Sequence, residues 1–389
     1  MKTLLKILSY VSAALVGAAA ATVVLCLTLN LGRVNKLEQL GNLIESRFIA
    51  ETDRAEMEDA AAAAMVNSLG DRWSHYLTAE AYAANMEQLT NAYVGVGMTV
   101  TAREDGDGID IVQVTPGGPA EEAGIQAGDV LIAVNGEAVD GLDVAGVSLK
   151  VKGEEGTFVE LTMRRETEAL TKKITFTVER RTIQVVVAEG EMITDQIGLI
   201  TITNFDDRCA SETIAALEQL LKDGAKSIIF DVRNNPGGFK HELVALLDYI
   251  LPEGPLFRSE MYTGATSVDN SDADCVSGIP MVVLVNENSY SAAEFFAAAL
   301  EEYDYASIVG EQTSGKGYFQ QTFQLADGSG VALSVGKYCT PKGISLAEAG
   351  GLVPDLIVDV DDETAAEIYV GILDTAEDPQ IQAAIELLK

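Results

Sequence analysis

Two serines stand where an apolar strand is expected to run into a helix. The segment PMVVLV at 280–285 leads into NENSYSAAEFFAAAL at 286–300, which places Ser289 and Ser291 at the mouth of that helix. A serine hydroxyl is a weak nucleophile until a neighbouring histidine, or a lysine whose pKa is lowered by burial, takes its proton. The segment therefore predicts nucleophilic chemistry at one of the two serines, provided that the chain supplies a base.

The base must come from a chain with only two histidines. His75 lies in DRWSHYL and His241 follows a glycine turn in GGFKHEL, and each is expected to be structural or solvated. Lys316 is the better candidate, because it follows the apolar run SIVG and lies between Gly315 and Gly317, where the backbone can turn sharply and bring the lysine inward. Taken alone, GKG is weak evidence and is more typical of a surface loop.

A second glycine turn, RNNPGG at 233–238, follows the apolar run IIFDV. Such a turn can present backbone N–H groups to the oxyanion that forms when a carbonyl carbon is attacked. In a parallel sheet the chemistry collects at the carboxyl ends of the strands, and both RNNPGG and NENSYS occupy that place. The two loops are therefore expected to lie at one edge of a sheet.

The downstream half of the chain predicts the sheet that would hold these loops. From residue 183 onward apolar strands alternate with helices: IGLITITNF precedes CASETIAALEQLLKDG, KSIIFDV precedes KHELVALLDYIL, and PMVVLV precedes SAAEFFAAALEEY. Alternation of this kind builds an α/β fold in which helices pack on a mostly parallel sheet.

Two other regions come before this α/β layer. Residues 34–91 repeat apolar side chains at three- and four-residue steps, as in KLEQLGNLIESRF and AEMEDAAAAAMVNSL, and are expected to be helical. From 93 to 181 short β-rich runs such as GIDIVQV and DVLIAVNG alternate with Gly, Pro and Asp turns around one short helix, LDVAGVSLKVKG. This second region predicts a small β-domain.

The N-terminus carries an uncharged apolar run, residues 7–32. A membrane-spanning helix needs about 20 residues, whereas the apolar region of a cleaved signal peptide has about 7–15. The run therefore favours an uncleaved single-pass anchor in the cell membrane, although the alanines at 18–21 leave cleavage open. Lys2 and Lys6 favour a cytoplasmic tip, which puts the rest of the chain outside the cytoplasm.

Composition narrows the function further. A formal net charge of −34 disfavours nucleic acid and anionic lipid surfaces as partners of the bulk of the chain. Cys209, Cys275 and Cys339 show no CxxC spacing, so with two histidines no metal site and no cofactor is expected. The sequence does not select a disulfide pair among these three cysteines.

Several segments, taken in order, resemble the carboxyl-terminal processing proteases, also called tail-specific proteases, which are PDZ-containing serine peptidases with a Ser–Lys mechanism. LGDRWSHYL resembles the segment leading to the PDZ domain, and YVGVG, TPGGPAEEAGIQAGDVLIAVNGEAV and VKGEEGT resemble that domain. IIFDVRNNPGG, NSYSAAEFFAAAL, VGEQTSGKGYFQ, KYCTPKG and GLVPD resemble the catalytic core. The resemblance covers nearly all of the chain after the apolar run and implies a core with a crotonase/ClpP-like layered sheet.

The resemblance implies a role for individual residues. Ser291, and not Ser289, matches the nucleophile, Lys316 matches the general base, and Gln320 matches the glutamine that orients the lysine. A glutamine can hydrogen-bond a neutral amine without adding the negative charge that would keep the lysine protonated.

The oxyanion donors implied by the resemblance are the N–H groups of Ala292 and Gly237, with Gly238 as the alternative to Gly237. Two residues depart from the family pattern. Tyr290 stands where a small residue is usual, and Ala293 stands where a serine is usual. Neither departure falls on a named catalytic role, but Tyr290 is expected to narrow the pocket for the substrate side chain.

The PDZ-like region indicates how the substrate is recognised. PDZ domains bind an extended C-terminal tail by strand addition, with backbone N–H groups capturing the carboxylate. Val94, Gly95 and Val96 are where that carboxylate-binding turn is expected. The partners implied are therefore proteins or peptides with free C-terminal tails.

The expectations combine into a membrane-anchored serine endopeptidase. The rival readings are a tethered PDZ module with an inactive protease-like core and, less strongly, a crotonase-like acyl-CoA enzyme. The helices within 34–69 and near the C-terminus could pair subunits of a homo-oligomer, but core packing explains them equally well. The predicted regions are the anchor at 1–32, a helical segment at 33–91, a PDZ domain at 92–181, a protease core at 182–375 and a C-terminal helix at 376–389.

Overall fold

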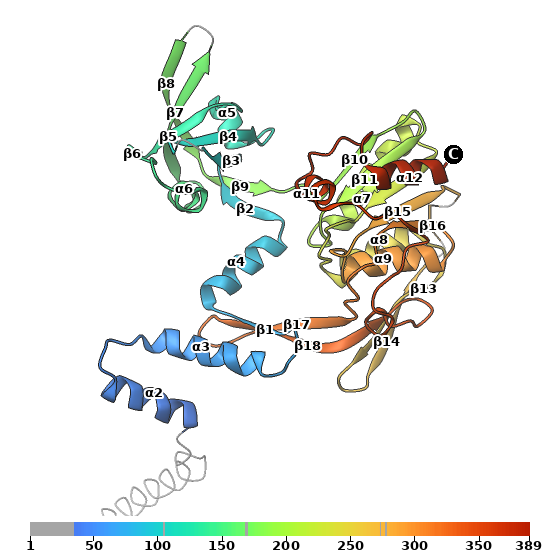
Figure 1. Cartoon of the computed structure of the whole chain (residues 1–389), viewed down its shortest axis with the longest axis horizontal. Coiled ribbons are helices and arrows are strands. Elements are labelled where there is room, and N and C mark those ends of the chain that lie inside the picture. Colours follow the sequence, from blue (N-terminus) through green and yellow to red (C-terminus); the bar gives the residue numbers. More distant parts are fainter. Residues whose placement is uncertain (1–34, 104–105, 168–169, 273, 277) are drawn as a thin grey trace, which may run out of the picture. The chain divides into compact units, whose positions relative to one another are not determined.

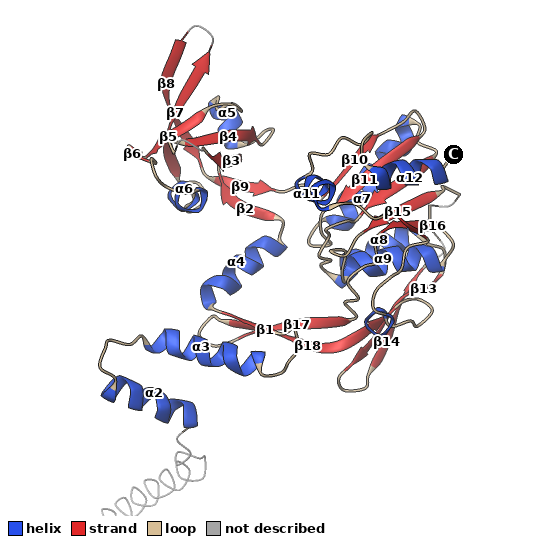
Figure 2. Ribbon diagram, viewed as in Figure 1, coloured by secondary structure: helices blue, strands red, loops and turns tan. Residues whose placement is uncertain are grey.

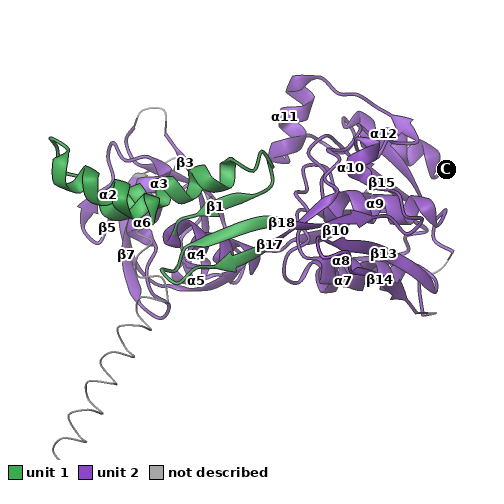
Figure 3. Ribbon diagram, turned by 90° about the horizontal axis from the view of Figure 1, so that it is seen from below, with its two compact units in different colours: residues 1–78, 322–333 green, residues 79–321, 334–389 purple. Residues whose placement is uncertain are grey.

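The computed structural model describes residues 35–103, 106–167, 170–272, 274–276 and 278–389. The chain divides into two compact units (Figure 3). Unit 1 holds the residues up to 78 together with 322–333, and unit 2 holds 79–321 and 334–389. The predicted anchor at 7–32 lies outside the described residues, and no helix among those described is long and apolar enough to cross a membrane.

Unit 1 contains the two helices that the three- and four-residue spacing predicts (Figure 1). Helix α2 (Lys36–Arg47) and helix α3 (Arg54–Asn67) each begin at a side chain that accepts a backbone N–H, Asn35 for α2 and Asp53 for α3. Caps of this kind satisfy N–H groups that have no partner within the helix. Strand β1 (His75–Leu77) pairs antiparallel with residues 330–332.

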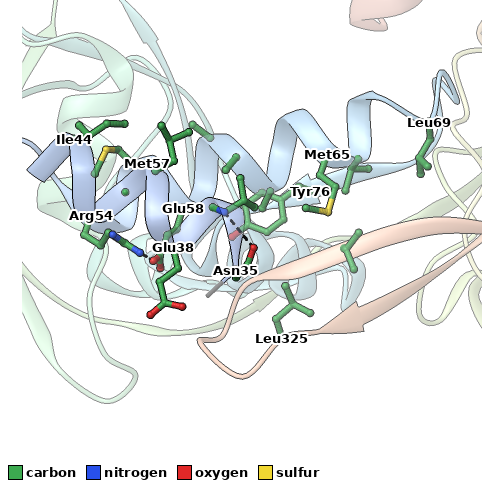
Figure 4. A pocket seen from close by; sticks show the side chains of 18 of the residues that line it. Asn35, Glu38, Ile44, Arg54, Met57, Glu58, Met65, Leu69, Tyr76 and Leu325 are labelled. Carbon is green, nitrogen blue, oxygen red and sulfur yellow. Dashed lines mark hydrogen bonds and ion pairs between the residues drawn. The ribbon is translucent and has the colours of Figure 1, made fainter. Parts of the chain in front are cut away.

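An apolar groove of about 940 Å³ runs through unit 1 (Figure 4). Its walls come from α2, α3 and residues 325–333, and include Ile44, Met57, Met65, Leu69 and Leu325. Gly41 is the one buried residue of α2, and α3 has none. Core packing of the described residues therefore does not account for the apolar side chains of these two helices.

The β-rich region of unit 2 is a small sheet with two short helices beside it (Figure 2). Its first and last strands, β2 (Ala92–Gly95) and β9 (Arg181–Gln184), pair antiparallel with each other. The runs GIDIVQV and DVLIAVNG form β4 (Ile109–Val114) and β5 (Val130–Val134). The same sheet contains β3 (Met98–Ala102), β6 (Glu137–Ala138), β7 (Phe158–Thr167) and β8 (Leu170–Glu179). The helices are α5 (Pro119–Ala123), which the sequence did not predict, and α6 (Val144–Val151), which it did.

The downstream part of unit 2 is the expected α/β layer. Its sheet has the order β10-β11-β12-β15-β16-β19, and every neighbouring pair is parallel except β10 with β11. The prediction of a mostly parallel sheet is therefore confirmed. The strands are β10 (Ala188–Met192), β11 (Ile197–Ile202), β12 (Ser227–Asp231), β15 (Met281–Val285), β16 (Ala306–Gly310) and β19 (Leu356–Ile357).

Helices cover both faces of this sheet. Alternate side chains of β12 point to opposite faces, so Ile228 and Phe230 join one buried cluster and Ile229 joins another. The first cluster contains residues of α7 (Cys209–Asp223), α8 (Lys240–Ile250) and α9 (Ala292–Glu302), and the second contains residues of α12 (Pro379–Leu387). This two-sided burial explains why the strands read as continuous apolar runs.

A second, antiparallel sheet in the core was not predicted. Residues 336–339 of β18 (Gly330–Cys339) pair with β13 (Gly254–Met261), which pairs in turn with β14 (Thr266–Ser271). Strand β17 (Tyr318–Gln324), which pairs with β18, begins in unit 2 and ends in unit 1. The remaining helices of unit 2 are α4 (Ala79–Leu89), α10 (Leu346–Ala349) and α11 (Asp362–Val370).

The three cysteines of the described chain are free thiols. Cys209 is buried at the start of α7, and burial raises the pKa of its thiol to about 12. Burial also raises the pKa of the half-buried Cys339. No disulfide therefore links the described residues.

Candidate active site

Ser291 occupies the turn between β15 and α9, as the sequence predicts. It is the residue that caps α9, and its backbone has φ 58° and ψ −124°, which is unusual for a residue with a Cβ atom. Such a conformation costs roughly 1–3 kcal/mol and persists only where the surroundings enforce it. Here the N–H of Tyr290 donates to the carbonyl of Asn235 at 3.1 Å, and the N–H of Ser291 donates to Glu294 at 2.9 Å.

Ser289 has a different environment. Its side chain is fully buried, and its hydroxyl donates to the carbonyl of Val232 at 2.7 Å and accepts the N–H of Asn286 at 3.0 Å. One bond joins Ser289 to Asn286 at the start of the same loop, and the other joins it to Val232, directly after β12. Ser289 thus stabilises the loop that carries Ser291.

Glu294, in the first turn of α9, is the centre of the site. Its carboxylate is fully buried. Oε2 accepts the N–H groups of Ser291 and Lys316, each at 2.9 Å. Oε1 accepts the hydroxyl of Thr313 at 2.6 Å and the N–H of Gly315 at 2.7 Å. One carboxylate therefore fixes the backbone of both residues expected to carry the chemistry.

Lys316 lies in the loop between β16 and β17, and its side chain is half-buried. Its Nζ lies 5.6 Å from the centre of the Tyr290 ring, in a cation–π contact. The flanking glycines permit close packing: a Cβ on Gly317 would come within 2.7 Å of Ala347, and Gly315 has φ +76°. The loop is therefore closely packed at the two glycines that flank Lys316.

Gln320 lies on β17. Its Nε2 donates to the hydroxyl of Ser334 at 3.0 Å and to the carbonyl of Tyr318 at 3.2 Å. These bonds hold the amide in the ladder between β17 and β18. The structure thus places Gln320 on the strand that follows the Lys316 loop, with its amide nitrogen directed to Ser334.

The glycine turn after β12 lies directly against the nucleophile. A Cβ on Gly237 would lie 2.7 Å from that of Ser291 and 2.8 Å from the nitrogen of Ala292. The N–H of Gly237 donates to Asn235 Oδ1 at 2.8 Å. No acceptor among the described residues takes the N–H of Gly238.

Arg233, at the start of the same turn, anchors it through two ion pairs. The sequence did not reveal this role. Its guanidinium is almost fully buried and contacts Asp231 at 2.5 Å and Asp378 at 2.8 Å. Burial alone lowers the pKa of Arg233, but the two carboxylates raise it above its usual range. Because Asp378 precedes α12, the C-terminal helix is tied to the loop beside Ser291.

Asp206 is a second buried acid near the turn that sequence reasoning missed. The residue is 9% exposed, and its Oδ1 has no hydrogen-bond partner among the described residues. Burial raises its pKa to about 6. Its backbone packs against Gly238, where an added Cβ would lie 2.6 Å from the Asp206 nitrogen.

Neither histidine joins the Glu294 network. The His241 side chain is 70% exposed, stacks on Phe239 and lies 3.6 Å from Glu242. His75 is exposed in β1, where a ring nitrogen lies 3.1 Å from the carbonyl of Trp73.

A small groove of about 80 Å³ opens in the β-rich region of unit 2. It is lined by the end of β2 and the residues that follow it, including Gly95 and Val96, and by α6, including Val147 and Val151. Val94 does not line the groove. It lies on β2, opposite Thr182 of β9.

Comparison with known proteins identifies both domains. Residues 196–358 match peptidase family S41, and residues 111–165 match the PDZ domain. The carboxy-terminal processing protease CtpA of Bacillus subtilis (strain 168) is 35% identical over 312 residues, which are 80% of this chain and 66% of that protein. A probable CtpA-like serine protease of Staphylococcus aureus (strain COL) is 32% identical over 329 residues, 84% of this chain and 65% of that protein. The chain thus spans slightly less than two thirds of the length of these relatives.

Solved structures resemble the chain as well. A putative S41 protease from Bacteroides fragilis NCTC 9343 covers 90% of this chain and 96% of its own with a TM-score of 0.54 and 16% identity, which supports the fold. A photosystem II D1 C-terminal processing protease is 28% identical, with a TM-score of 0.48, over 82% of this chain and 86% of its own. By these matches, residues 196–358 are similar to peptidase family S41 and residues 111–165 to a PDZ domain, and the sequence relatives are carboxy-terminal processing proteases and proteins like them.

Proposed function

We propose that this protein is a membrane-anchored endopeptidase that recognises the C-terminal tails of protein substrates through its PDZ domain and cuts them with Ser291 as nucleophile and Lys316 as base. The observation that carries the proposal is the Glu294 carboxylate, which binds the backbone N–H of both residues at 2.9 Å. A fixed geometry of this kind is what a nucleophile and its base require.

The proposed reaction has two halves. The Ser291 hydroxyl attacks the scissile carbonyl carbon while the neutral Lys316 amine accepts the hydroxyl proton. The resulting ammonium then protonates the leaving amine as the peptide C–N bond breaks, which leaves an acyl-enzyme ester. Water, losing a proton to Lys316, attacks the ester, and the proton returns to Ser291 as the carboxylic acid product departs.

The oxyanion of each tetrahedral intermediate needs N–H donors. Ala292, the first residue of α9, supplies one of the helix N–H groups that lack an intrahelical partner, in the positive field of the helix. For the second donor we favour Gly238 over Gly237, because Gly237 already donates to Asn235. Gly237 would serve only after releasing that bond.

The PDZ groove is the proposed entry point for the substrate tail. Gly95 and Val96 line one side of the groove with their backbone, and the apolar side chains of α6 form the facing wall. An extended tail fits between a strand and a helix arranged in this way. Capture of the tail raises the local concentration of the adjoining chain at the site.

The alternative is a tethered PDZ module with an inactive core. It predicts tail binding without cleavage. The buried Glu294 network favours the peptidase, since a binding module gains nothing from fixing Ser291 in a strained backbone conformation.

The proposed anchor rests on the apolar run at 7–32, with Lys2 and Lys6 before it. An uncharged run of this length matches a bilayer span. The positive residues at the short end favour a cytoplasmic tip and an extracytoplasmic catalytic part.

Cleavage of an unfolded protein substrate should vanish in Ser291→Ala. Lys316→Ala should lower kcat by roughly 10²–10⁴, the usual worth of a general base. Lys316→Arg should not restore activity, since a guanidinium stays protonated. His241→Ala is the matched control and should keep most of the activity. An inactive His241→Ala beside an active Lys316→Ala would reverse the assignment.

Glu294→Gln should cost both activity and stability. The amide offers one acceptor atom where four donors converge, so the free energy of unfolding should fall by about 3 kcal/mol. Urea unfolding and single-turnover cleavage would measure the two effects. Glu287→Gln, an exposed glutamate in the preceding loop, is the control and should match the wild type. Wild-type unfolding and turnover in Glu294→Gln would show that the network does not organise the site.

Val151→Asp should weaken tail binding, because it puts a negative charge in the apolar wall facing the substrate carboxylate. We expect roughly a tenfold to hundredfold loss in affinity for peptides with a free C-terminus. Leu149→Asp on the same helix is the control, since Leu149 is 77% exposed and does not line the groove. Both variants should keep Ser291 reactive toward a fluorophosphonate. Equal peptide affinity in the two variants would place the binding site elsewhere.

Full-length protein should sediment with membranes and resist alkaline extraction. Protease added outside intact cells or spheroplasts should reach its core. A chain that starts at Lys36 is the control and should be found in the soluble fraction. Recovery of a mature soluble form that begins near Ala21 would show that the N-terminal run is cleaved.

A further inference from the structure

Tyr290 immediately precedes Ser291 and stands where the resemblance leads one to expect a small residue. Its ring is half-buried and faces the amine of Lys316, with 5.6 Å between Nζ and the ring centre. This is the distance at which an aromatic face attracts a cation. The ring therefore contacts the group that the proposed mechanism uses as its base.

The contact between ring and amine is built into the site. The N–H of Tyr290 donates to Asn235, and the next N–H, that of Ser291, donates to Glu294. The same Glu294 oxygen accepts the N–H of Lys316. Glu294 therefore holds the backbone next to Tyr290 and the backbone of Lys316 in place. The ring and the amine are in contact in this arrangement.

An aromatic ring stabilises the ammonium form of a lysine and gives little to the neutral amine. A general base must be the neutral amine when it takes the serine proton. The ring of Tyr290 thus opposes deprotonation of Lys316 in the free enzyme. Substrate that displaces Lys316 from the ring would remove this opposition.

We propose that Tyr290 is a positioning residue that holds Lys316 as an ammonium over its ring and thereby sets the pH at which the base begins to work. The inference rests on the proposed Ser–Lys function. In this proposal Tyr290 controls the pH at which Lys316 loses its proton, in addition to any effect on the substrate pocket.

Other ionisable groups around the Lys316 loop come from α9, β17, β18 and α10. Glu294 of α9 binds the loop backbone, and Tyr318 of β17 follows it in sequence. Tyr338 of β18 donates its N–H to the Gly317 carbonyl, and burial raises the pKa of its phenol. Glu348 of α10 adjoins Ala347, which packs against Gly317. All four stay unchanged when only position 290 is varied, so a shift in the pH profile reports on the ring.

The competing role for Tyr290 is a wall of the pocket for the substrate side chain. A wall affects KM and the choice of substrate side chain at every pH. It does not move the midpoint of the ionisation that controls kcat/KM for the free enzyme. The pH profile therefore separates the two roles.

The test is the pH dependence of kcat/KM on a peptide substrate for the wild type, Tyr290→Phe and Tyr290→Leu. Tyr290→Phe keeps the aromatic face and should keep the wild-type midpoint. Tyr290→Leu keeps apolar bulk without the face and should move the midpoint about 0.5 to 1 unit toward lower pH. Tyr290→Ala provides the same readout if the leucine variant does not fold.

The outcomes are distinct. A Tyr290→Leu or Tyr290→Ala profile with the wild-type midpoint overturns the role of Tyr290 while leaving the Ser–Lys function intact. A midpoint that moves equally in Tyr290→Phe also overturns it, because the aromatic face is then irrelevant. Absence of Ser291-dependent cleavage in the wild type would refute the proposed function itself, and the inference with it.

Discussion

The site depends on one buried carboxylate. Glu294 is fully buried, and protein groups donate four hydrogen bonds to its two oxygens. Its donors lie on two loops that are far apart in sequence, the turn before α9 and the loop that carries Lys316. Neither loop can move alone without leaving charge or N–H groups unsatisfied. The positive φ of Ser291 persists because this arrangement leaves it no alternative.

A second buried network, formed by Arg233, Asp231 and Asp378, holds the glycine turn that lies against Ser291. Arg233 joins Asp231, at the end of β12, to Asp378, at the start of α12. An arginine held between two carboxylates presents a rigid, planar link. The glycine turn next to Ser291 is thus braced by the last helix of the chain. Rigid supports of this kind keep reacting groups within the narrow tolerances that catalysis requires.

Much of this arrangement follows from the sequence. Continuous apolar runs alternating with helices predicted the parallel sheet, and the position of NENSYS and RNNPGG at strand ends predicted that these two loops would meet. Strand β14 was missed because TSVDNS lacks an apolar face, and the pairing of β13 with β18 joins segments that are far apart in sequence, which local pattern does not encode. Glu294 appeared in the sequence only as a helical residue, since its burial becomes visible once the Lys316 loop folds over α9.

Unit 1 joins residues from both ends of the sequence, which affects its folding during synthesis on the ribosome. β1 (His75–Leu77) takes its partner from residues 330–332, so the strand leaves the ribosome long before its neighbour exists. At typical rates of synthesis the delay is roughly 10–50 s. During that time the apolar sides of α2 and α3 lack the wall that Leu325 and Val331 later supply. The N-terminal helices of the newborn chain thus expose apolar side chains until residues 325–333, in the last fifth of the protein, have been made.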